Sequence, residues 1–352
     1  MTGDSTRNLT EILKRLIKEN GPISFAQYMA ESNTRYYNSH DPIGERKDFV
    51  TAPEISQVFG ELVGIWLTNL WQQAGRPDPI HFVELGPGRG TLAVDAIRVA
   101  AKFALKPKIH LVEGSDSLKK IQLSNLPSAH HHIDVSNLPD DGPLLIVANE
   151  FFDALPVRQI IKNQNDWFER LVGLEAGQLT FIMDSMPMTS AIPDCFKSAN
   201  QGAILELNAA SETIMTEISK RLATQGGAAL VIDYGSFAQN VGSTVQAVKN
   251  HRKVNIFESP GAMDLTAHVN FSSLRRASEG QKCTILGTAT QGDWLNRLGA
   301  KTRFDILKRE TPKKSELLAR QYHRLSDKDQ MGTLFKVMGI SGKDWPEKAP
   351  GF

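Results

Sequence analysis

Several features that mark special classes of protein are scarce or absent in this sequence. Its 352 residues include only two cysteines, Cys195 and Cys283, which lie far apart and form no Cys-x-x-Cys pair. Two isolated cysteines cannot frame a structural metal site, and they indicate a reduced compartment. No run approaches the roughly 18 consecutive apolar residues that indicate a membrane-spanning helix. We therefore expect no metal and no membrane insertion.

An excess of charge of one sign is also lacking. Lys and Arg total 40 and Asp and Glu total 39, within a composition that is 41% hydrophobic. Non-specific binding of nucleic acid depends on a basic surface, so we expect no nucleic-acid partner. The N-terminus carries Asp4, Glu11 and Glu19 without an apolar core, unlike a signal or transit peptide. We expect a globular, cytoplasmic protein with a core of ordinary size.

Residues 1–76 carry helical patterns and are expected to form an N-terminal helical extension and lid. Residues 35–50 show no clear period and are expected to form a loop. The sequence Thr51-Ala-Pro-Glu54 is a strong start signal, with Thr51 as the N-cap of a helix that carries a wide apolar face. Gly60 and Gly64 lie one turn apart in this helix and indicate close packing against a neighbour.

Residues 77–352 alternate short apolar runs with helical patterns, which predicts a doubly wound, Rossmann-like α/β core with a mostly parallel sheet. Residues 157–205 interrupt this alternation with a hairpin pattern, 167–172 and 178–183, and are expected to be a β-rich insertion. Residues 236–282 are expected to form a lid-like region of loops and short helices. The seven expected strands are 80–85, 108–113, 131–134, 144–148, 228–232, 283–286 and 333–338.

A glycine-rich turn joins the first expected strand to a helix. It reads Glu84-Leu-Gly86-Pro87-Gly88-Arg-Gly90 and lies at the carboxyl edge of the sheet, where such folds bind ligands. Its glycines permit positive φ and a close approach of ligand to backbone. The spacing departs from the dinucleotide fingerprint, and Pro87 lacks an N–H for a pyrophosphate. The turn favours S-adenosylmethionine, whose positive charge suits Glu84; an ordinary tight turn is the alternative.

Two further acidic residues follow the next two strands. Glu113 ends the second strand, 23 residues after Gly90, where an acidic residue accepts hydrogen bonds from ribose hydroxyls. A surface glutamate at a strand end is the alternative, but together with the glycine turn Glu113 favours a nucleoside site. Asp134, after the third strand, is expected either to reach the adenine amino group or to be solvated.

An acidic and aromatic run, Asn149-Glu150-Phe-Phe-Asp153, follows the fourth strand. Two carboxylates three residues apart can grip a planar guanidinium, although a loop whose acids complement a helix start has the same composition. His268 is a candidate base or substrate contact, with a helix start as the alternative. The contiguous His130–His132 are expected to be a strand, because alternating side chains diverge. Asp233-Tyr234-Gly235 follows the fifth strand and is expected to open towards the site.

These motifs resemble the MidA-like methyltransferases, a family that includes a mitochondrial respiratory complex I assembly factor that methylates arginine. The resemblance is carried by Val83–Leu92 and by the specific run Asn149–Pro156, and it extends over nearly the whole chain. Two departures concern the lid: Lys47 stands where the family usually has glycine, and Asn270 where it usually has aspartate. Other matching segments include Asp48–Ser56, Thr244–Gln246, Asp264–Phe271, Thr290–Gly292 and Met331–Lys336.

The resemblance implies a seven-stranded class I methyltransferase fold in a bacterial member of the family. It implies S-adenosyl-L-methionine as methyl donor, S-adenosyl-L-homocysteine as product and a protein arginine as acceptor, with a complex I subunit as the expected partner. Asp48–Ser56, including Thr51 and Pro53, would close over the cofactor. By position, the cofactor residues would be Glu84, Gly86, Pro87, Gly88, Gly90, Glu113 and Asp134, and the acceptor residues Asn149, Glu150, Asp153 and His268.

Three other functions stay open at the level of sequence. A non-catalytic assembly factor could keep the fold and bind a partner protein through the insertion and lid. A small-molecule methyltransferase would share the cofactor site, because fold does not fix the acceptor. A nicotinamide-dependent oxidoreductase is disfavoured by the glycine spacing. The sequence leaves the oligomeric state open.

Overall fold

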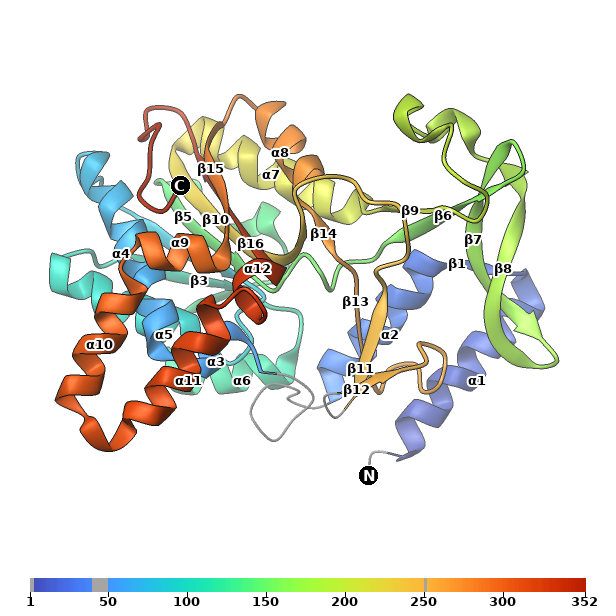
Figure 1. The fold of residues 1–352 in the computed structure, drawn as a ribbon, viewed down its shortest axis with the longest axis horizontal. Helices are drawn as coiled ribbons and strands as arrows, with labels where there is room; N and C mark the ends of the chain where they lie inside the picture. The colour runs from blue at the N-terminus through green and yellow to red at the C-terminus, as the bar shows by residue number, and fades with distance from the viewer. Residues whose placement is uncertain (1–2, 40–49, 250–251) are drawn as a thin grey trace. The chain divides into compact units, whose positions relative to one another are not determined.

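The computed structural model of the chain describes residues 3–39, 50–249 and 252–352, and it divides into two units with separate cores. The sheet unit comprises the described residues of 43–152 together with 212–238 and 269–352. The accessory unit comprises the described residues of 1–42 together with 153–211 and 239–268. Each unit is therefore built from segments that are distant in sequence (Figure 1).

The sheet unit is organised around a sheet with the strand order β15-β16-β10-β5-β2-β3-β4. The five strands from β10 to β4 are parallel to their neighbours, whereas β16 runs antiparallel to both β10 and β15. A short strand, β14 (Val269–Asn270), pairs with the end of β10 outside this path. The seven strands are β2 (His81–Leu85), β3 (Lys108–Val112), β4 (His130–His132), β5 (Leu144–Asn149), β10 (Gly227–Ser236), β15 (Thr284–Thr290) and β16 (Phe335–Ser341).

This topology confirms the doubly wound, seven-stranded α/β fold expected from the sequence. Every expected strand is present, and His130–His132 form β4 as expected. The order reverses between β2 and β5, which are adjacent in the sheet although β3 and β4 intervene in sequence. Ligands bind at the carboxyl ends of the strands at such a switch point. All six residues of β5 are buried, as a central parallel strand requires.

Helices connect the strands of the sheet unit, and α10 and α11 form a helical hairpin (Figure 1). Helix α4 packs on α5 through Gly60 and Gly64: a Cβ on Gly64 would lie 2.5 Å from the carbonyl oxygen of Ala96, which confirms the expected close packing. The helices are α3 (Ala52–Ile55), α4 (Gln57–Gln73), α5 (Thr91–Ala100), α6 (Asp116–Asn125), α7 (Ala209–Gln225), α8 (Phe271–Glu279), α9 (Gln291–Arg297), α10 (Ala300–Glu310), α11 (Ser315–Ser326) and α12 (Met331–Leu334).

The packing of α4 bears on where the chain divides. Its side chains, among them Trp66 and Leu70, belong to the same buried cluster as residues of β2 and β10. The boundary expected from the sequence lies between residues 76 and 77, whereas the structure groups α4 with the sheet. The difference arises because α4 has a wide apolar face that is buried against the core of the sheet unit.

The helix start expected at Thr51 is confirmed, because Thr51 is the N-cap residue of α3, but the helix that follows is not continuous. Instead of one helix beginning at Thr51, the chain forms α3 and then α4, separated by Ser56 in an extended conformation (φ −158°, ψ 136°). The Ser56 hydroxyl accepts a hydrogen bond from the Val58 N–H, whereas the Thr51 side chain makes no capping bond within the described part of the chain. A second, competing N-cap therefore splits the helix.

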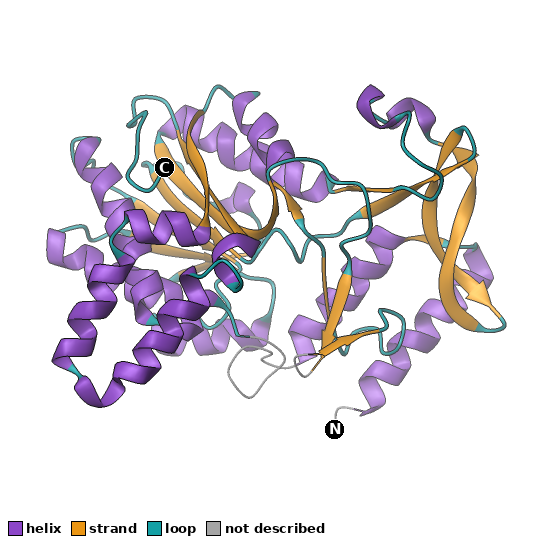
Figure 2. Cartoon of the chain, viewed as in Figure 1, coloured by secondary structure: helices purple, strands orange, loops and turns teal. Residues whose placement is uncertain are grey.

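In its described residues, the accessory unit contains two sheets and the two α-helices α1 and α2, and the long β7–β8 hairpin is visible in Figure 2. This hairpin confirms the expected β-rich insertion, and it turns at Ala176 and Gly177, which have φ values of 48° and 75°. The elements are α1 (Gly3–Asn20), β1 (Ile23–Ser24), α2 (Phe25–Ser39), β6 (Arg158–Asn163), β7 (Asp166–Glu175), β8 (Gln178–Pro187), β9 (Ile204–Leu207), β11 (Gln246–Lys249), β12 (Arg252–Val254) and β13 (Asp264–Thr266).

Two loop predictions in the accessory unit need correction. The loop expected over residues 35–50 was wrong for 35–39, because α2 continues to Ser39 with Tyr36 fully buried. The rest of that segment, residues 40–49, includes Lys47 and the start of the expected lid and lies outside the described residues. The lid-like region 236–282 was expected to form loops and short helices, but part of it forms the three-stranded sheet β12-β11-β13. Tertiary pairing of these short strands leaves little periodicity in the sequence.

Candidate functional site

The turn between β2 and α5 holds three glycines in the left-handed region. Gly86, Gly88 and Gly90 have φ values of 60°, 54° and 79°. L-amino acids rarely adopt this region, so the glycines are required by the backbone path. The Gly86 N–H donates to the carbonyl oxygen of Val112 at 3.0 Å, and the Gly90 N–H donates to that of Pro87 at 2.7 Å. The turn is thereby fixed at the carboxyl ends of β2 and β3.

Glu84 is buried beneath this turn. Its side chain is 3% exposed, and its Oε2 has no hydrogen-bond partner among the residues that the structure describes. Burial raises the pKa of the Glu84 carboxyl from its ordinary 4.5 to about 8. A hydrogen bond from the backbone of Ala93 lowers this pKa but is the smaller effect. A buried carboxyl oxygen without a partner is costly and indicates a place for a donor or a cation.

Glu113, expected to bind a ribose, is held in place by two donors. The Ser115 N–H donates to its Oε1 at 2.8 Å, and the Gln122 amide donates to its Oε2 at 3.0 Å. Burial raises the pKa of Glu113, while these hydrogen bonds act in the opposite direction. Each oxygen has two acceptor sites, so the carboxylate retains capacity for a pair of hydroxyl donors.

Gln122 in α6 is a site residue that the sequence analysis missed. Its amide nitrogen also donates to the carbonyl oxygen of Gly88 at 2.7 Å, and its amide oxygen lies 2.8 Å from His131 Nε2. One fully buried side chain thus connects the glycine turn, Glu113 and β4. The only sequence signal was a polar residue on the inner face of a short helix.

Asp134, after β4, caps a 3-10 turn, Val135–Asn137. Its carboxylate accepts a hydrogen bond from the Ser136 N–H at 2.7 Å, and this bond is the main reason that its pKa lies below the ordinary value. The side chain is exposed, so both alternatives from the sequence, contact with adenine and solvation, stay open.

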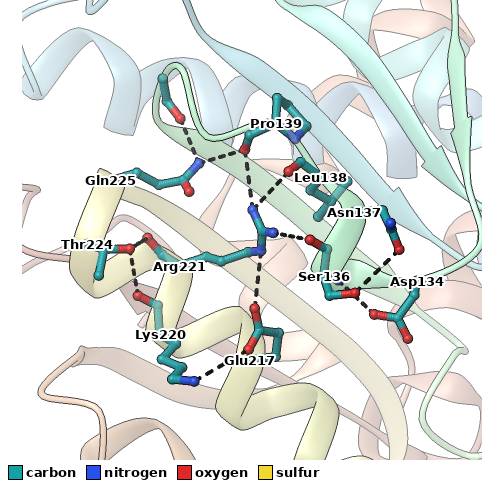
Figure 3. Close-up of polar contacts among 11 residues, drawn as sticks. Asp134, Ser136, Asn137, Leu138, Pro139, Glu217, Lys220, Arg221, Thr224 and Gln225 are labelled. Atoms are coloured by element: carbon teal, nitrogen blue, oxygen red, sulfur yellow. Dashed lines mark hydrogen bonds and ion pairs between the residues drawn. The ribbon is translucent and has the colours of Figure 1, made fainter.

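The segment that carries Asp134 is anchored from α7 (Figure 3). The guanidinium of Arg221 donates to the carbonyl oxygens of Ser136, Leu138 and Pro139 at 2.5, 3.1 and 3.3 Å. Glu217 lies 3.4 Å from the same guanidinium. Arg221 therefore fixes the backbone that follows Asp134, a connection between distant segments that the sequence does not reveal.

The second strand-end turn follows β5 and contains Asn149 and Glu150. Glu150 has φ 51°, a conformation that is uncommon for a residue with a side chain. Its carboxylate accepts hydrogen bonds from the Ala52 N–H at 3.1 Å and from the Asn149 amide at 3.2 Å. The Asn149 Oδ1 is buried without a partner in the described part of the protein. The turn therefore presents a carboxylate and an amide oxygen at the switch point of the sheet.

Asp233, at the end of β10, holds this turn. Its Oδ2 accepts hydrogen bonds from the N–H groups of Phe151 and Phe152 at 3.2 and 3.0 Å, and the Glu150 N–H donates to the carbonyl oxygen of Ile232 at 2.9 Å. Asp233 is fully buried. The sequence placed it near the site but not in this role: it stabilises the backbone around Glu150.

The segment of α3 lies beside both turns. Besides the bond from Ala52 to Glu150, the Thr91 hydroxyl donates to the carboxylate of Glu54. Thr51 and Pro53, expected to contact the cofactor, flank these bonds and are partly exposed. Within the sheet unit, the structure thus brings α3, the glycine turn and the acidic turn together. Cofactor contacts by Thr51 and Pro53 remain a prediction.

Asp153 and His268 belong to the accessory unit. The N–H of Ala267, next to His268, donates to the carbonyl oxygen of Asp153 at 3.0 Å, so the backbones of these two expected acceptor residues are neighbours. The His268 N–H donates to the Thr244 hydroxyl at 2.9 Å. Asp153 is 6% exposed.

Comparisons with known proteins identify the family. Residues 62–289 match the family model described as "Putative S-adenosyl-L-methionine-dependent methyltransferase". The chain belongs to this family. It is an S-adenosyl-L-methionine-dependent methyltransferase, which confirms the family, the enzyme class and the cofactor expected from the sequence. The family assignment also removes the nicotinamide-dependent oxidoreductase from consideration.

Relatives of known name agree with this family. The chain is 33% identical to human protein arginine methyltransferase NDUFAF7, mitochondrial, over 94% of this chain and 83% of that protein. It is 32% identical to the Xenopus tropicalis protein of the same name, over 92% and 83% of the two chains. A Burkholderia thailandensis protein solved bound to S-adenosyl-homocysteine shares the fold, with a TM-score of 0.85, 24% identity and coverage of 100% of this chain and 97% of that one.

The sheet unit suits the methyl donor of the family. Gly86 packs closely on the acidic turn, because a Cβ there would lie 3.0 Å from Cδ2 of Phe151. Among the described residues, Glu84 Oε2 and Asn149 Oδ1 are buried acceptors without a partner. Glu113 retains acceptor capacity for ribose hydroxyls.

In the described ranges, no helix is long and apolar enough to span a membrane.

Proposed function

We propose that this methyltransferase transfers a methyl group to a guanidinium nitrogen of arginine in a protein substrate. The proposal is supported by the names of its relatives, which are protein arginine methyltransferases. The observation that carries it is the turn after β5, where Glu150 is kept in a left-handed conformation by four separate hydrogen bonds. A strained acidic residue at a switch point is typical of a functional site.

The chain's own residues divide the chemistry between them. S-adenosyl-L-methionine, when bound, supplies an electrophilic methyl group on a cationic sulfur. Gly86, Gly88 and Gly90 let the ligand approach the backbone, and Glu84 and Glu113 provide acceptors for its polar groups. Exclusion of water by the buried turn strengthens these interactions.

Glu150 orients the acceptor. Arginine is protonated at neutral pH, so its attacking nitrogen needs a lone pair that the delocalised cation withholds. A carboxylate that binds the other nitrogens concentrates the positive charge on them and holds the nucleophile in line. Asn149 and Asp153 are proposed to complete this acceptor side, and a carboxylate, His268 or water takes the proton after transfer.

Finer assignments are part of the same proposal. We propose that the protein substrate is a subunit of respiratory complex I and that the protein acts in the cytoplasm. The first follows from the resemblance of the motifs from Val83 to Leu92 and from Asn149 to Pro156, and the second from the two isolated cysteines, which indicate a reduced compartment. A small-molecule acceptor and a non-catalytic assembly role are the alternatives that an experiment must separate.

Two measurements test the proposal. Calorimetric titration with S-adenosyl-L-homocysteine and, separately, NAD should show binding of the former alone, lost in Gly88→Asp. The enzyme is then incubated with methyl-labelled donor and a lysate from cells that lack it, and the protein fraction is hydrolysed. Labelled methylarginine supports the proposal. Label in small molecules only would favour the small-molecule acceptor, and cofactor binding without transfer would favour the assembly role.

A further inference from the structure

Three histidines on the adjacent strands β2, β3 and β4 lie in series, and no step of the proposed function uses them. Nδ1 of His81 lies 3.0 Å from Nε2 of His110, and Nδ1 of His110 lies 2.9 Å from Nε2 of His132. The side chains of His81 and His110 are 1% and 6% exposed. In each contact of this histidine row, one imidazole nitrogen must donate a proton and the other must accept it.

Both ends of the histidine row meet acceptors. At one end, Nε2 of His81 lies 2.8 Å from Oδ1 of Asp141. At the other end, a hydrogen bond to the backbone of Asn137 raises the pKa of His132, so the ring donates to a carbonyl oxygen. The four contacts therefore need four N–H groups, whereas three neutral imidazoles supply three. One contact lacks a proton.

The contact without a proton is the one at Asp141. Nε2 of His81 is buried and has no hydrogen-bond partner among the described residues, although the carboxylate lies close to it. With this nitrogen unprotonated, Nδ1 carries the proton of His81, and the donors run in one direction from His81 through His110 and His132. A lone pair on His81 then faces a carboxylate, which is repulsive.

The surroundings of His81 make it a basic site of moderate strength. Burial lowers the pKa of His81 below its ordinary 6.5, the charge of Asp141 raises it, and the charge of Lys108 lowers it. Lys108 itself lies 3.2 Å from the same carboxylate. Burial and then the neighbouring histidines lower the pKa of His110 to about 3, so the middle of the row stays neutral.

His132 is a poorer site for an additional proton than His81. Burial lowers the pKa of His132, the bond to Asn137 raises it, and then His130 on the same strand and Arg221 of α7 lower it. Within the described part of the chain, His81 is the member of the row that faces a carboxylate. An additional proton therefore binds at Nε2 of His81 as the pH falls below 6.5.

The row reaches the cofactor side of the sheet unit. The segment that follows β4 carries Asp134, is fixed in its middle by bonds from α7 (Figure 3) and contacts His81 through Asp141. The carbonyl oxygen of His132 accepts a hydrogen bond from the Glu113 N–H at 3.0 Å. The two residues expected to bind the nucleoside of the cofactor, Glu113 and Asp134, are thus connected to the row.

We propose that Nε2 of His81 is a proton-binding site, and that a proton held between His81 and Asp141 fixes the segment of Asp134 and strengthens cofactor binding. The proton converts a repulsive contact into a charge-assisted hydrogen bond, so that all four contacts of the row are bonded. Linkage is reciprocal, so the cofactor must also strengthen proton binding. The inference rests on the proposed function in assigning the nucleoside to Glu113 and Asp134.

Histidine NMR of the full-length protein labelled with nitrogen-15 histidine tests this proposal. The chain has nine histidines, so His81→Gln assigns the His81 signals; should that variant not fold, through-space contacts to His110 and Lys108 assign them. At pH 8, His81 should carry its proton on Nδ1, because this nitrogen donates to His110. As the pH falls, the ring should take up one proton with a midpoint below 6.5, because burial lowers its pKa.

Asp141→Asn should weaken proton binding by His81 about fivefold, because the amide removes the facing charge and can itself donate to Nε2. Asp327→Asn is the matched control: Asp327 lies beside the exposed His323 in the same unit, so the His81 midpoint should stay unchanged. Saturating S-adenosyl-L-homocysteine should tighten the proton about fivefold in the wild type and not in Asp141→Asn, whose amide ties the segment in either state.

A His81 ring that stays neutral down to about pH 4.5, carries its proton on Nε2 at pH 8, or titrates alike in Asp141→Asn would overturn the proton site. A midpoint that S-adenosyl-L-homocysteine leaves unchanged, although calorimetry shows that it binds, would overturn the coupling to the cofactor. Failure of the wild type to bind S-adenosyl-L-homocysteine at pH 8 rejects the proposed function instead, and the titration of His81 then decides the proton site by itself.

Discussion

The turns that follow β2 and β5 lie side by side at the switch point, yet they are built in opposite ways. After β2, three left-handed positions are all glycine: Gly86, Gly88 and Gly90. After β5, the left-handed position is Glu150, and the backbone is held by bonds from elsewhere, including those to Asp233. In the first turn the residue type permits the conformation; in the second, tertiary contacts impose it.

In the proposed function, this difference separates cofactor binding by the first turn from the chemistry of the second. A turn of glycines keeps its shape without support and lets a ligand lie against the backbone, as a cofactor site requires. A turn that keeps a carboxylate in a strained conformation gains a charged group in a fixed direction, and the cost is met by hydrogen bonds around it.

Replacing Glu150 by Gln should lower turnover by about a thousandfold while S-adenosyl-L-homocysteine affinity changes little. The amide keeps the shape of the side chain but cannot concentrate charge on a guanidinium. Single-turnover transfer of labelled methyl and calorimetry measure the two quantities. Glu150→Asn is the companion variant, because asparagine tolerates the left-handed region. It should be more stable than Glu150→Gln and equally inactive. Loss of cofactor binding in Glu150→Gln would assign Glu150 to the cofactor instead.

Gly86→Val should weaken S-adenosyl-L-homocysteine binding by about a hundredfold, because a β-branched residue at φ 60° is strained and its Cβ would press on Phe151. Calorimetry measures the loss. Gly177→Val is the control: Gly177 has φ 75°, but no described atom lies within 4 Å of an added Cβ. It should lower the melting temperature and leave cofactor affinity alone. Equal loss of affinity in both variants would show a general effect of strain.

The contrast also explains what the sequence could predict. The seven strands, the glycine turn and the acidic run were all predictable, because each is encoded by periodicity or by residue types a few positions apart. The roles of Asp233, Gln122 and Arg221 were not, because each depends on hydrogen bonds to backbone groups from 34 to 85 residues away. Such contacts leave only an isolated polar residue in the sequence.

Errors in the secondary structure have the same origin. The loop expected after residue 35 failed because Tyr36 is buried by tertiary packing, although its neighbours show no helical period. The single helix expected after Thr51 is instead two helices, α3 and α4, because Ser56 offers a second cap, a choice that local signals left undecided. The small β12-β11-β13 sheet consists of strands too short to show alternation.

Asp233→Ala should lower kcat about tenfold and reduce stability, because the N–H groups of Phe151 and Phe152 lose their acceptor. Combining it with Glu150→Gly tests the comparison directly. Glycine needs no support at a positive φ, so the double variant should regain about 1 kcal/mol relative to the sum of the single changes. Chemical denaturation measures this coupling. Strict additivity would mean that Asp233 does not support the strained turn.

Protonation of Glu84 should couple to cofactor binding. Its pKa, raised from 4.5 to about 8, means that the folded protein binds this proton more tightly than the unfolded chain, so this group's contribution to stability is lost as pH rises from about 4.5 to about 8. A cationic ligand favours the ionised carboxyl. Binding of S-adenosyl-L-methionine at pH 7 should therefore release close to one proton.

Calorimetry in buffers with different ionisation enthalpies counts the protons released on binding. Glu84→Gln cannot release this proton, so its binding enthalpy should be independent of the buffer, and its stability should vary less between pH 5 and pH 8. Proton uptake by the wild type, or equal release by Glu84→Gln, would show that another group titrates on binding.

Gln122→Leu should produce the smallest change, a loss of cofactor affinity of about fivefold. Leucine fills similar space but leaves the Gly88 carbonyl oxygen and the Glu113 carboxylate each one donor short. Gln225→Leu is a matched control, because Gln225 also donates to two carbonyl oxygens, those of Pro139 and Gly142, away from the glycine turn (Figure 3). If the glycines hold their turn largely unaided, Gln122 acts mainly through Glu113. Ligands that lack the ribose hydroxyls should then bind the wild type and Gln122→Leu with equal affinity. If Gln122→Leu also binds these ligands about fivefold more weakly, Gln122 acts on the glycine turn instead.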